Sequence, residues 1–158
     1  FEQGEIRLAD VAGVYPEENT LRAIRITGVQ LRAYLEQSAR YFTVDASGNV
    51  GTDPTVPGSS FDIVSGATYV IDLRRPAGSR IRDLAVRGRF VGALDTYTLA
   101  LSSYRQGGGG GYAMLQSAPV VYDRNEGVRE LLVEDLRRRG VLDPADFDSV
   151  TWRIEPAP

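Results

Sequence analysis

The sequence contains no histidine, no cysteine and no lysine, so all 18 of its basic residues are arginine. Zinc and other transition-metal sites depend on imidazole and thiolate ligands, so sites of that kind are excluded. The same absences exclude a serine–histidine or cysteine–histidine nucleophile, a Schiff base and a P-loop. Carboxylate acid–base chemistry, an all-oxygen metal site and pure binding remain. Binding is favoured, because the carboxylates are not grouped at the spacing of a metal-ligand loop.

A basic excess and long apolar runs are also missing. The net charge of −3 offers no polybasic surface for a nucleic-acid polymer. Arg137, Arg138 and Arg139 lie at the end of a predicted helix, where cations complement the helix dipole. No apolar run approaches the roughly 18 residues that a membrane helix needs, so membrane insertion is not predicted.

The length and composition suit one globular domain spanning residues 1–158. Apolar residues make up 42% of the chain, as in ordinary soluble proteins. The sequence shows neither an internal repeat nor a break in composition. It opens at Phe1 without a signal pattern, so we expect it to be a segment of a longer protein.

Helical and strand-like segments are interspersed along the chain, which predicts an α+β fold with mixed sheets. Thr27 and Gln30 form a capping box that should begin a helix. Residues 43–60 are rich in turn formers and predict a loop. A further helix is expected at 126–139, capped by Asp123 or Asn125. The remaining predicted elements are a helix at 6–14 and strands at 20–26, 61–63, 68–73, 81–86, 96–101, 120–122 and 150–154.

Five consecutive glycines, Gly107–Gly111, are the most unusual local feature. They lack the Gly-Lys-Ser/Thr ending of a P-loop, and their spacing does not fit a dinucleotide fingerprint. By composition alone they could form a flexible surface loop. However, they follow a predicted strand and Tyr104, so a stiff element would bring an aromatic ring to a loop whose backbone a ligand can approach closely.

Five ordered motifs connect this loop to a known family. They are Y-P-E-E-N-T-L from Tyr15, T-G-V-Q-L from Thr27, F-D-I-V-S-G-A-T-Y-V-I-D from Phe61, P-A-G-S-R-I from Pro76 and T-L-A-L-S-S-Y-R-Q-G-G-G-G-G-Y from Thr98. In this order they resemble the C-terminal domain of the 5'-nucleotidase family, over residues 4 to about 154. The family includes 5'-nucleotidases, 2',3'-cyclic-nucleotide phosphodiesterases and UDP-sugar hydrolases.

The resemblance implies a four-layer α/β/β/α domain of a secreted, periplasmic or cell-surface enzyme. In the family, a separate N-terminal metallophosphoesterase domain holds two divalent metal ions and hydrolyses the phosphate ester. The C-terminal domain holds the nucleoside, with its base between two aromatic rings. We therefore expect no cofactor and no catalytic residue on this chain, and an N-terminal domain of the same protein as its partner.

The resemblance also implies site residues. Tyr104 matches the stacking aromatic before the glycine loop, and Asn19 matches the asparagine that hydrogen-bonds the base. The loop glycines Gly108, Gly109 and Gly110 join the candidate substrate-binding set. The alternatives are a tyrosine that packs on the core and an asparagine that caps a loop. Tyr112 and Phe61 are interpreted as core residues.

The sequence departs from the family at two positions. Glu17 stands where the first stacking aromatic is usual, and Gly110 stands where many nucleotidases carry an aspartate that binds the ribose hydroxyls. The family's N-G-G-G-x-R motif would lie before Phe1. The all-glycine loop and the Tyr104–Arg105 pair favour the cyclic phosphodiesterase branch. The sequence thus predicts a nucleoside-recognition domain; the alternative is a structural or interaction module that has kept the fold and lost the ligand.

Overall fold

The computed structural model describes residues 3–147 and 149–155. Its helices are α1 (Leu8–Val14), α2 (Gly28–Ala39), α3 (Ser103–Gln106) and α4 (Val128–Arg139). Its strands are β1 (Thr20–Thr27), β2 (Phe42–Val44), β3 (Val50–Thr52), β4 (Ala67–Asp72), β5 (Ile81–Val86), β6 (Arg89–Phe90), β7 (Thr96–Ser102), β8 (Val120–Gly127) and β9 (Trp152–Glu155). Short 3₁₀ turns lie at Gly58–Ser60, Gly109–Gly111, Ala113–Leu115 and Pro144–Phe147.

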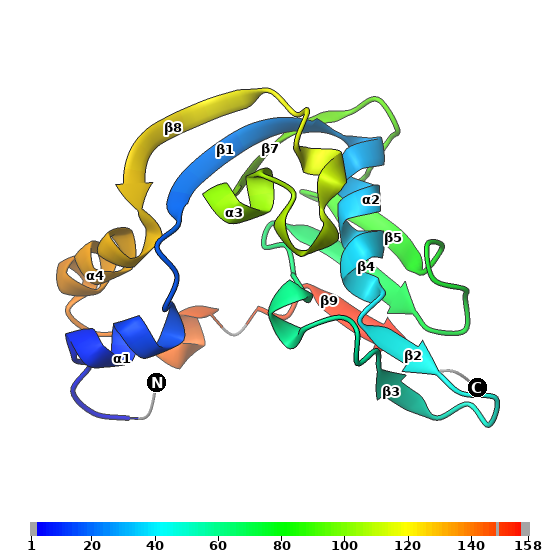
Figure 1. Ribbon diagram of the computed structural model, residues 1–158, viewed down its shortest axis with the longest axis horizontal. Helices are drawn as coiled ribbons and strands as arrows, with labels where there is room; N and C mark the ends of the chain where they lie inside the picture. Colours follow the sequence, from blue (N-terminus) through cyan, green and yellow to red (C-terminus); the bar gives the residue numbers. More distant parts are fainter. Residues whose placement is uncertain (1–2, 148, 156–158) are drawn as a thin grey trace.

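The strands form two main sheets and one hairpin. In the first sheet, β1 lies between β7 and β8 and is antiparallel to both. The second has the order β6-β5-β4-β9, with β4 and β9 parallel and the other pairs antiparallel. The first sheet arches over the molecule, with α1 and α4 at one end and α2 at the other (Figure 1). The predicted α+β class with mixed sheets is confirmed.

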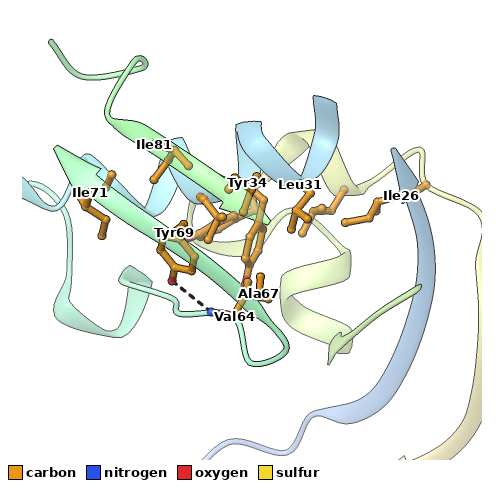
Figure 2. Packing of buried hydrophobic residues seen from close by; sticks show 14 of the residues in the cluster. Ile26, Leu31, Tyr34, Val64, Ala67, Tyr69, Ile71 and Ile81 are labelled. Atoms are coloured by element: carbon orange, nitrogen blue, oxygen red, sulfur yellow. Dashed lines mark hydrogen bonds between the residues drawn. The ribbon is translucent and has the colours of Figure 1, made fainter. Parts of the chain in front are cut away.

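Helix α2 links the two sheets and supplies much of the core. Its capping box forms as the sequence predicts: the Gln30 amide donates to Thr27 Oγ1, and the Thr27 amide donates to Gln30 Oε1. Its buried side chains meet those of β1, β4 and β5 in one cluster (Figure 2). The cluster includes Ile24, Ile26, Leu31, Tyr34, Leu35, Ala39, Tyr69, Ile71, Ile81 and Leu84. Tyr112, at the end of the glycine run, is also fully buried there, as predicted.

Three local predictions need correction. Residues 61–63 are not a strand, because side chains from α2 and α3 hold this segment in place of strand neighbours. The predicted loop at 43–60 contains the β2–β3 hairpin, whose strands have three residues each. Helix α4 starts after Gly127, without a side-chain cap, because β8 continues to that residue through Asn125 at φ 56°.

Among the described residues, no helix is both long enough and apolar enough to cross a membrane.

Candidate functional site

Tyr104 lies on the four-residue helix α3, directly after β7, and its side chain remains 57% exposed. The glycine loop covers one face of the Tyr104 ring. A Cβ placed on Gly109 would come within 2.4 Å of Tyr104 Cζ and 2.5 Å of both Cε atoms. These near-equal distances place Gly109 over the face of the ring. Any residue with a Cβ at position 109 would collide with the ring, so only glycine allows this close approach. The ring therefore rests on backbone and presents its second face outward.

The glycine loop adopts a conformation that requires glycine at three positions. Gly108, Gly110 and Gly111 have φ of 87°, 73° and 87°, which only glycine adopts without strain. Gln37 of α2 donates to the Gly110 carbonyl at 3.4 Å, and Gln116 donates to the Gly107 carbonyl at 2.9 Å. Side chains from α2 and from the segment after the loop therefore hydrogen-bond to its backbone carbonyls.

Position 110 has no room for a side chain. A Cβ there would lie 2.1 Å from Arg105 Nη1 and 2.9 Å from Ser60 Oγ. In this chain the volume that an aspartate would enter is therefore occupied by the guanidinium of Arg105. A ligand at this loop meets main-chain atoms in place of a carboxylate.

Arg105 itself is buried, with 7% of its surface exposed. Its Nη1 donates to the Gly109 carbonyl at 2.6 Å, and its Nη2 donates to Asp62 Oδ1 at 2.7 Å. The guanidinium also lies 4.3 Å from the centre of the Tyr112 ring. In the sequence, Arg105 stood out only as the second residue of the Tyr104–Arg105 pair. Its role in the loop depends on contacts with residues far along the chain, which leave no sequence signal.

Two tyrosines lie beside the ion pair of Arg105 and Asp62, whose side chains are 9% and 19% exposed. Tyr34 donates to Asp62 Oδ2 at 2.6 Å, and Tyr112 donates to the Ser60 carbonyl at 2.8 Å. Burial, followed by the hydrogen bond to the Asp62 carboxylate, raises the pKa of Tyr34. Burial and the charge of Asp62 raise the pKa of Tyr112 to about 12. Both phenols are therefore neutral donors at physiological pH.

The loop before β1 carries the other candidate residues. Asn19 donates through Nδ2 to Tyr15 Oη at 3.3 Å, while no side chain or amide in the described part of the protein donates to its Oδ1. Glu17 is exposed. Arg129 of α4 holds this loop by donating to the carbonyls of Tyr15 at 3.0 Å, Pro16 at 2.5 Å and Glu17 at 3.3 Å.

The structure brings this loop beside Tyr104. The amide of Thr20, which follows Asn19, donates to Ser103 Oγ at 3.1 Å, and Ser103 precedes Tyr104. Further along the same two segments, Arg22 donates to Gln106 Oε1 at 2.6 Å. Figure 1 shows α3 tucked beneath β1 at this junction. Asn19, Tyr104 and the glycine loop therefore lie in one region, with Glu17 two residues from Asn19 on the same loop.

Two surface hollows lie elsewhere on the molecule. One of about 1240 Å³ lies between α1, α4 and the segment after α4, lined by Val11, Leu136 and Phe147 among others. Another, of about 530 Å³, lies beside the β2–β3 hairpin. Neither is lined by Tyr104 or Asn19. We place the candidate site at Tyr104 because an open aromatic face binds a flat ligand without an enclosed cavity.

In the described part of the chain, the usual metal-ligating side chains are not grouped together. Within residues 3–147 and 149–155, there is no group of three or more histidine, cysteine, aspartate or glutamate side chains that could hold one. The buried Asp72 instead accepts hydrogen bonds from Arg74 and then Arg82, which keep the pKa of its carboxyl well below the usual range.

Comparison with protein families gives a match to the 5'-nucleotidase, C-terminal domain model over residues 1–117. Among curated proteins, a trifunctional nucleotide phosphoesterase protein, YfkN, of Bacillus subtilis is 24% identical over 97% of this chain and 11% of its own length. A 2',3'-cyclic-nucleotide 2'-phosphodiesterase/3'-nucleotidase of Salmonella typhimurium is 26% identical over 98% of this chain and 27% of its own length. The chain therefore spans about a quarter or less of these relatives.

Solved structures agree with this match. A putative 5'-nucleotidase from Staphylococcus aureus has a TM-score of 0.80 and 30% identity, over 92% of this chain and 29% of its own. A 5'-nucleotidase precursor from Thermus thermophilus has a TM-score of 0.77 and 24% identity, over 97% of this chain and 28% of its own. The second similarity concerns the fold alone.

Proposed function

Because this chain belongs to the 5'-nucleotidase C-terminal domain family, we propose that it recognises the nucleoside part of a nucleotide for a phosphohydrolase. Its named relatives act on nucleotides, as a trifunctional nucleotide phosphoesterase and a cyclic-nucleotide phosphodiesterase/3'-nucleotidase. In the proposal, this domain binds the base and the sugar. Binding energy from these remote groups then orients the phosphate for reaction elsewhere.

The observation that carries the proposal is the placement of the Tyr104 ring. One face rests on Gly109 while the side chain stays 57% exposed, although exposing an aromatic ring to water is unfavourable. Stacking of a base on such a ring is worth about 1–3 kcal/mol. The nearby Asn19 offers an unoccupied Oδ1 within the described part of the chain, and an amide suits the mixed donors and acceptors of a base edge.

Hydrolysis is assigned to another domain of a longer protein. The relatives extend far beyond the region that this chain matches, and the described residues offer no cluster for metal ions. In two-metal phosphohydrolases the ions supply an activated water and stabilise the phosphate charge. We propose a parent enzyme of the 5'-nucleotidase or 2',3'-cyclic-nucleotide phosphodiesterase type, secreted or located in the periplasm or at the cell surface.

A second candidate is a structural or interaction module without a ligand. Two observations favour it: the exposed Glu17 stands where a second ring would be expected, and Gly110 brings no side chain to the sugar. A carboxylate cannot stack on a base, and it repels an anionic phosphate. The two candidates differ in whether the chain binds a nucleoside at all.

Calorimetric titration with adenosine and uridine distinguishes them. We expect binding by the unaltered chain, and Tyr104→Ala should weaken it by about 1–3 kcal/mol, the usual value of one base stack. The free energy of unfolding should fall by less than the roughly 3–5 kcal/mol of a core aromatic truncation. Absence of binding by the unaltered chain would favour the structural module. Unfolding at the larger cost, with affinity per folded molecule unchanged, would make Tyr104 a core residue.

A further inference from the structure

Arg105 is a buried charge whose hydrogen bonds reach three residues in two segments, the glycine loop and residues 59–62. Beyond Gly109 and Asp62, its Nη2 donates to the Ser59 carbonyl at 3.0 Å. A guanidinium presents its donors in one rigid plane, so these acceptors fix its orientation. The ring of Tyr112, 4.3 Å from the guanidinium carbon, closes one face by a cation–π contact.

Asp62 connects this charge to helix α2. Its backbone amide donates to Ser38 Oγ at 2.8 Å, and its carbonyl accepts from the same hydroxyl at 2.5 Å. Its second carboxylate oxygen accepts from Tyr34 of the same helix at 2.6 Å. Arg105 is thus bonded, through one residue, to the best-buried helix of the domain.

A short series of contacts leads from Arg105 to the exposed ring. Arg105 Nη1 holds the Gly109 carbonyl, and Gly109 lies over the inner face of the Tyr104 ring. Tyr104 and Arg105 are also neighbours on α3, yet 57% of the surface of Tyr104 is exposed and only 7% of that of Arg105. The same arginine therefore fixes both the loop under the ring and the helix that carries it.

We propose that Arg105 is a positioning residue: it sets the Tyr104 ring for stacking by holding the Gly109 peptide against the ring's inner face. Because Arg105 is buried, it acts through Gly109 and Tyr104. The effect of this positioning on ligand affinity rests on the proposed nucleoside binding. The positioning itself is a property of the free protein.

The positioning is tested without ligand by NMR. The α protons of Gly109 lie over an aromatic face, so they should be shifted upfield, and Tyr104→Leu should abolish that shift. Arg105→Lys keeps the charge but cannot hold three oxygens in one plane, so it should reduce the shift. Arg74→Lys is the matched control, because Arg74 also donates two hydrogen bonds to an aspartate, Asp72, away from this site. It should leave the Gly109 shift unchanged.

Affinity is measured on the same proteins by titration with adenosine, per folded molecule. Arg105→Lys should weaken binding about tenfold, within the range that loss of a base stack gives, and Arg74→Lys should not. If Arg105→Lys does not fold, Asp62→Asn, which keeps an oxygen for Arg105 but removes the charge, should change the Gly109 shift and the affinity in the same direction.

The outcomes separate the two proposals. If the unaltered chain does not bind adenosine, the proposed function fails, while the Gly109 shift still decides the positioning. If the Gly109 shift and the affinity of the folded Arg105→Lys or Asp62→Asn protein equal those of the unaltered chain, Arg105 only stabilises the core, and the inference is overturned.

Discussion

Helices α2 and α4 have 12 residues each, yet they are held in different ways. Helix α2 has a capping box and seven buried residues, and its side chains bond to the glycine-loop region. Helix α4 has no side-chain cap and no buried residue among those described, although its sequence carries a clear apolar stripe. It is held by hydrogen bonds that Arg129 and the Val128 amide donate to carbonyls of the loop at residues 15–19.

The candidate site lies between these two regions. The Tyr104 side of the site is anchored on the core through Arg105, and the Glu17–Asn19 side is anchored on α4 through Arg129. Local stability follows the number of buried apolar contacts. We therefore infer a rigid stacking platform opposite a more easily displaced loop, an arrangement in which the ring is preformed and the loop can adapt to a ligand.

The largest expected effect comes from truncating matched leucines on the two helices. Leu35 of α2 is 1% exposed, and Leu132 of α4 is 38% exposed. Leu35→Ala should lower the free energy of unfolding by about 2–5 kcal/mol, because it leaves a cavity in the core. Leu132→Ala should cost less than about 1 kcal/mol. Urea denaturation measures both, and equal losses would contradict the difference between the helices.

Alkaline pH should lower the free energy of unfolding through Tyr112, which is buried against Tyr34 of α2. The pKa of Tyr112 is about 12 in the folded protein, against the ordinary value of 10.0. The unfolded chain therefore loses this proton first, so the stability that the neutral phenol contributes is complete below pH 10 and is lost as the pH rises to 12. The loss over this range should be about 2–3 kcal/mol. Denaturation of Tyr112→Phe should show a smaller loss, and an identical pH profile for the two proteins would refute this explanation.

Two glycines in the same loop offer a test of the platform's rigidity. Gly110 has φ 73° and no room for a Cβ, whereas Gly107 has φ −72° and only ordinary contacts around a Cβ. Gly110→Ala should destabilise the domain by about 1–3 kcal/mol through backbone strain and displacement of Arg105. Gly107→Ala should change the thermal midpoint little. If both variants have the same thermal midpoint as the unaltered protein, the loop is not rigid.

The smallest effect is expected at the adaptable loop. Glu17→Tyr would supply a second aromatic face, and it should tighten adenosine binding by about 1 kcal/mol, the usual value of one aromatic contact. Glu17→Gln is the control that removes the charge without adding a ring. Weaker binding by Glu17→Tyr, measured calorimetrically, would show that Glu17 itself contacts the ligand.

The sequence could predict features whose interacting residues are close together in the chain, and it could not predict those that depend on distant partners. The capping box of α2 was predicted because Thr27 and Gln30 are three residues apart and need no other partner. The strand predicted at 61–63 was wrong because Asp62 is held by Ser38 and Arg105, which are 24 and 43 residues away. The cap predicted for α4 failed for a similar reason, since Asp123 pairs with Arg22 across the sheet.

The site shows the same division. Tyr104 and the glycines could be proposed because they are adjacent in sequence, and Asn19 could be proposed through a family motif. The burial of Arg105 beneath them was not visible, because neighbouring residues on a short helix differ in environment only through tertiary packing. The support of loop 15–19 by Arg129 was missed for the same reason, with more than 110 residues between the partners.

The proposed function depends on the binding of a nucleoside base to the open face of Tyr104. The most direct test is a titration of isotope-labelled protein with adenosine, followed by NMR and repeated with Tyr104→Ala. We expect chemical-shift changes confined to the amides of Gly108, Gly109 and Gly110, the Tyr104 ring and Asn19, and we expect the variant to lose them. Absence of shifts in the unaltered protein, or shifts located only in the hollow between α1 and α4, would contradict it.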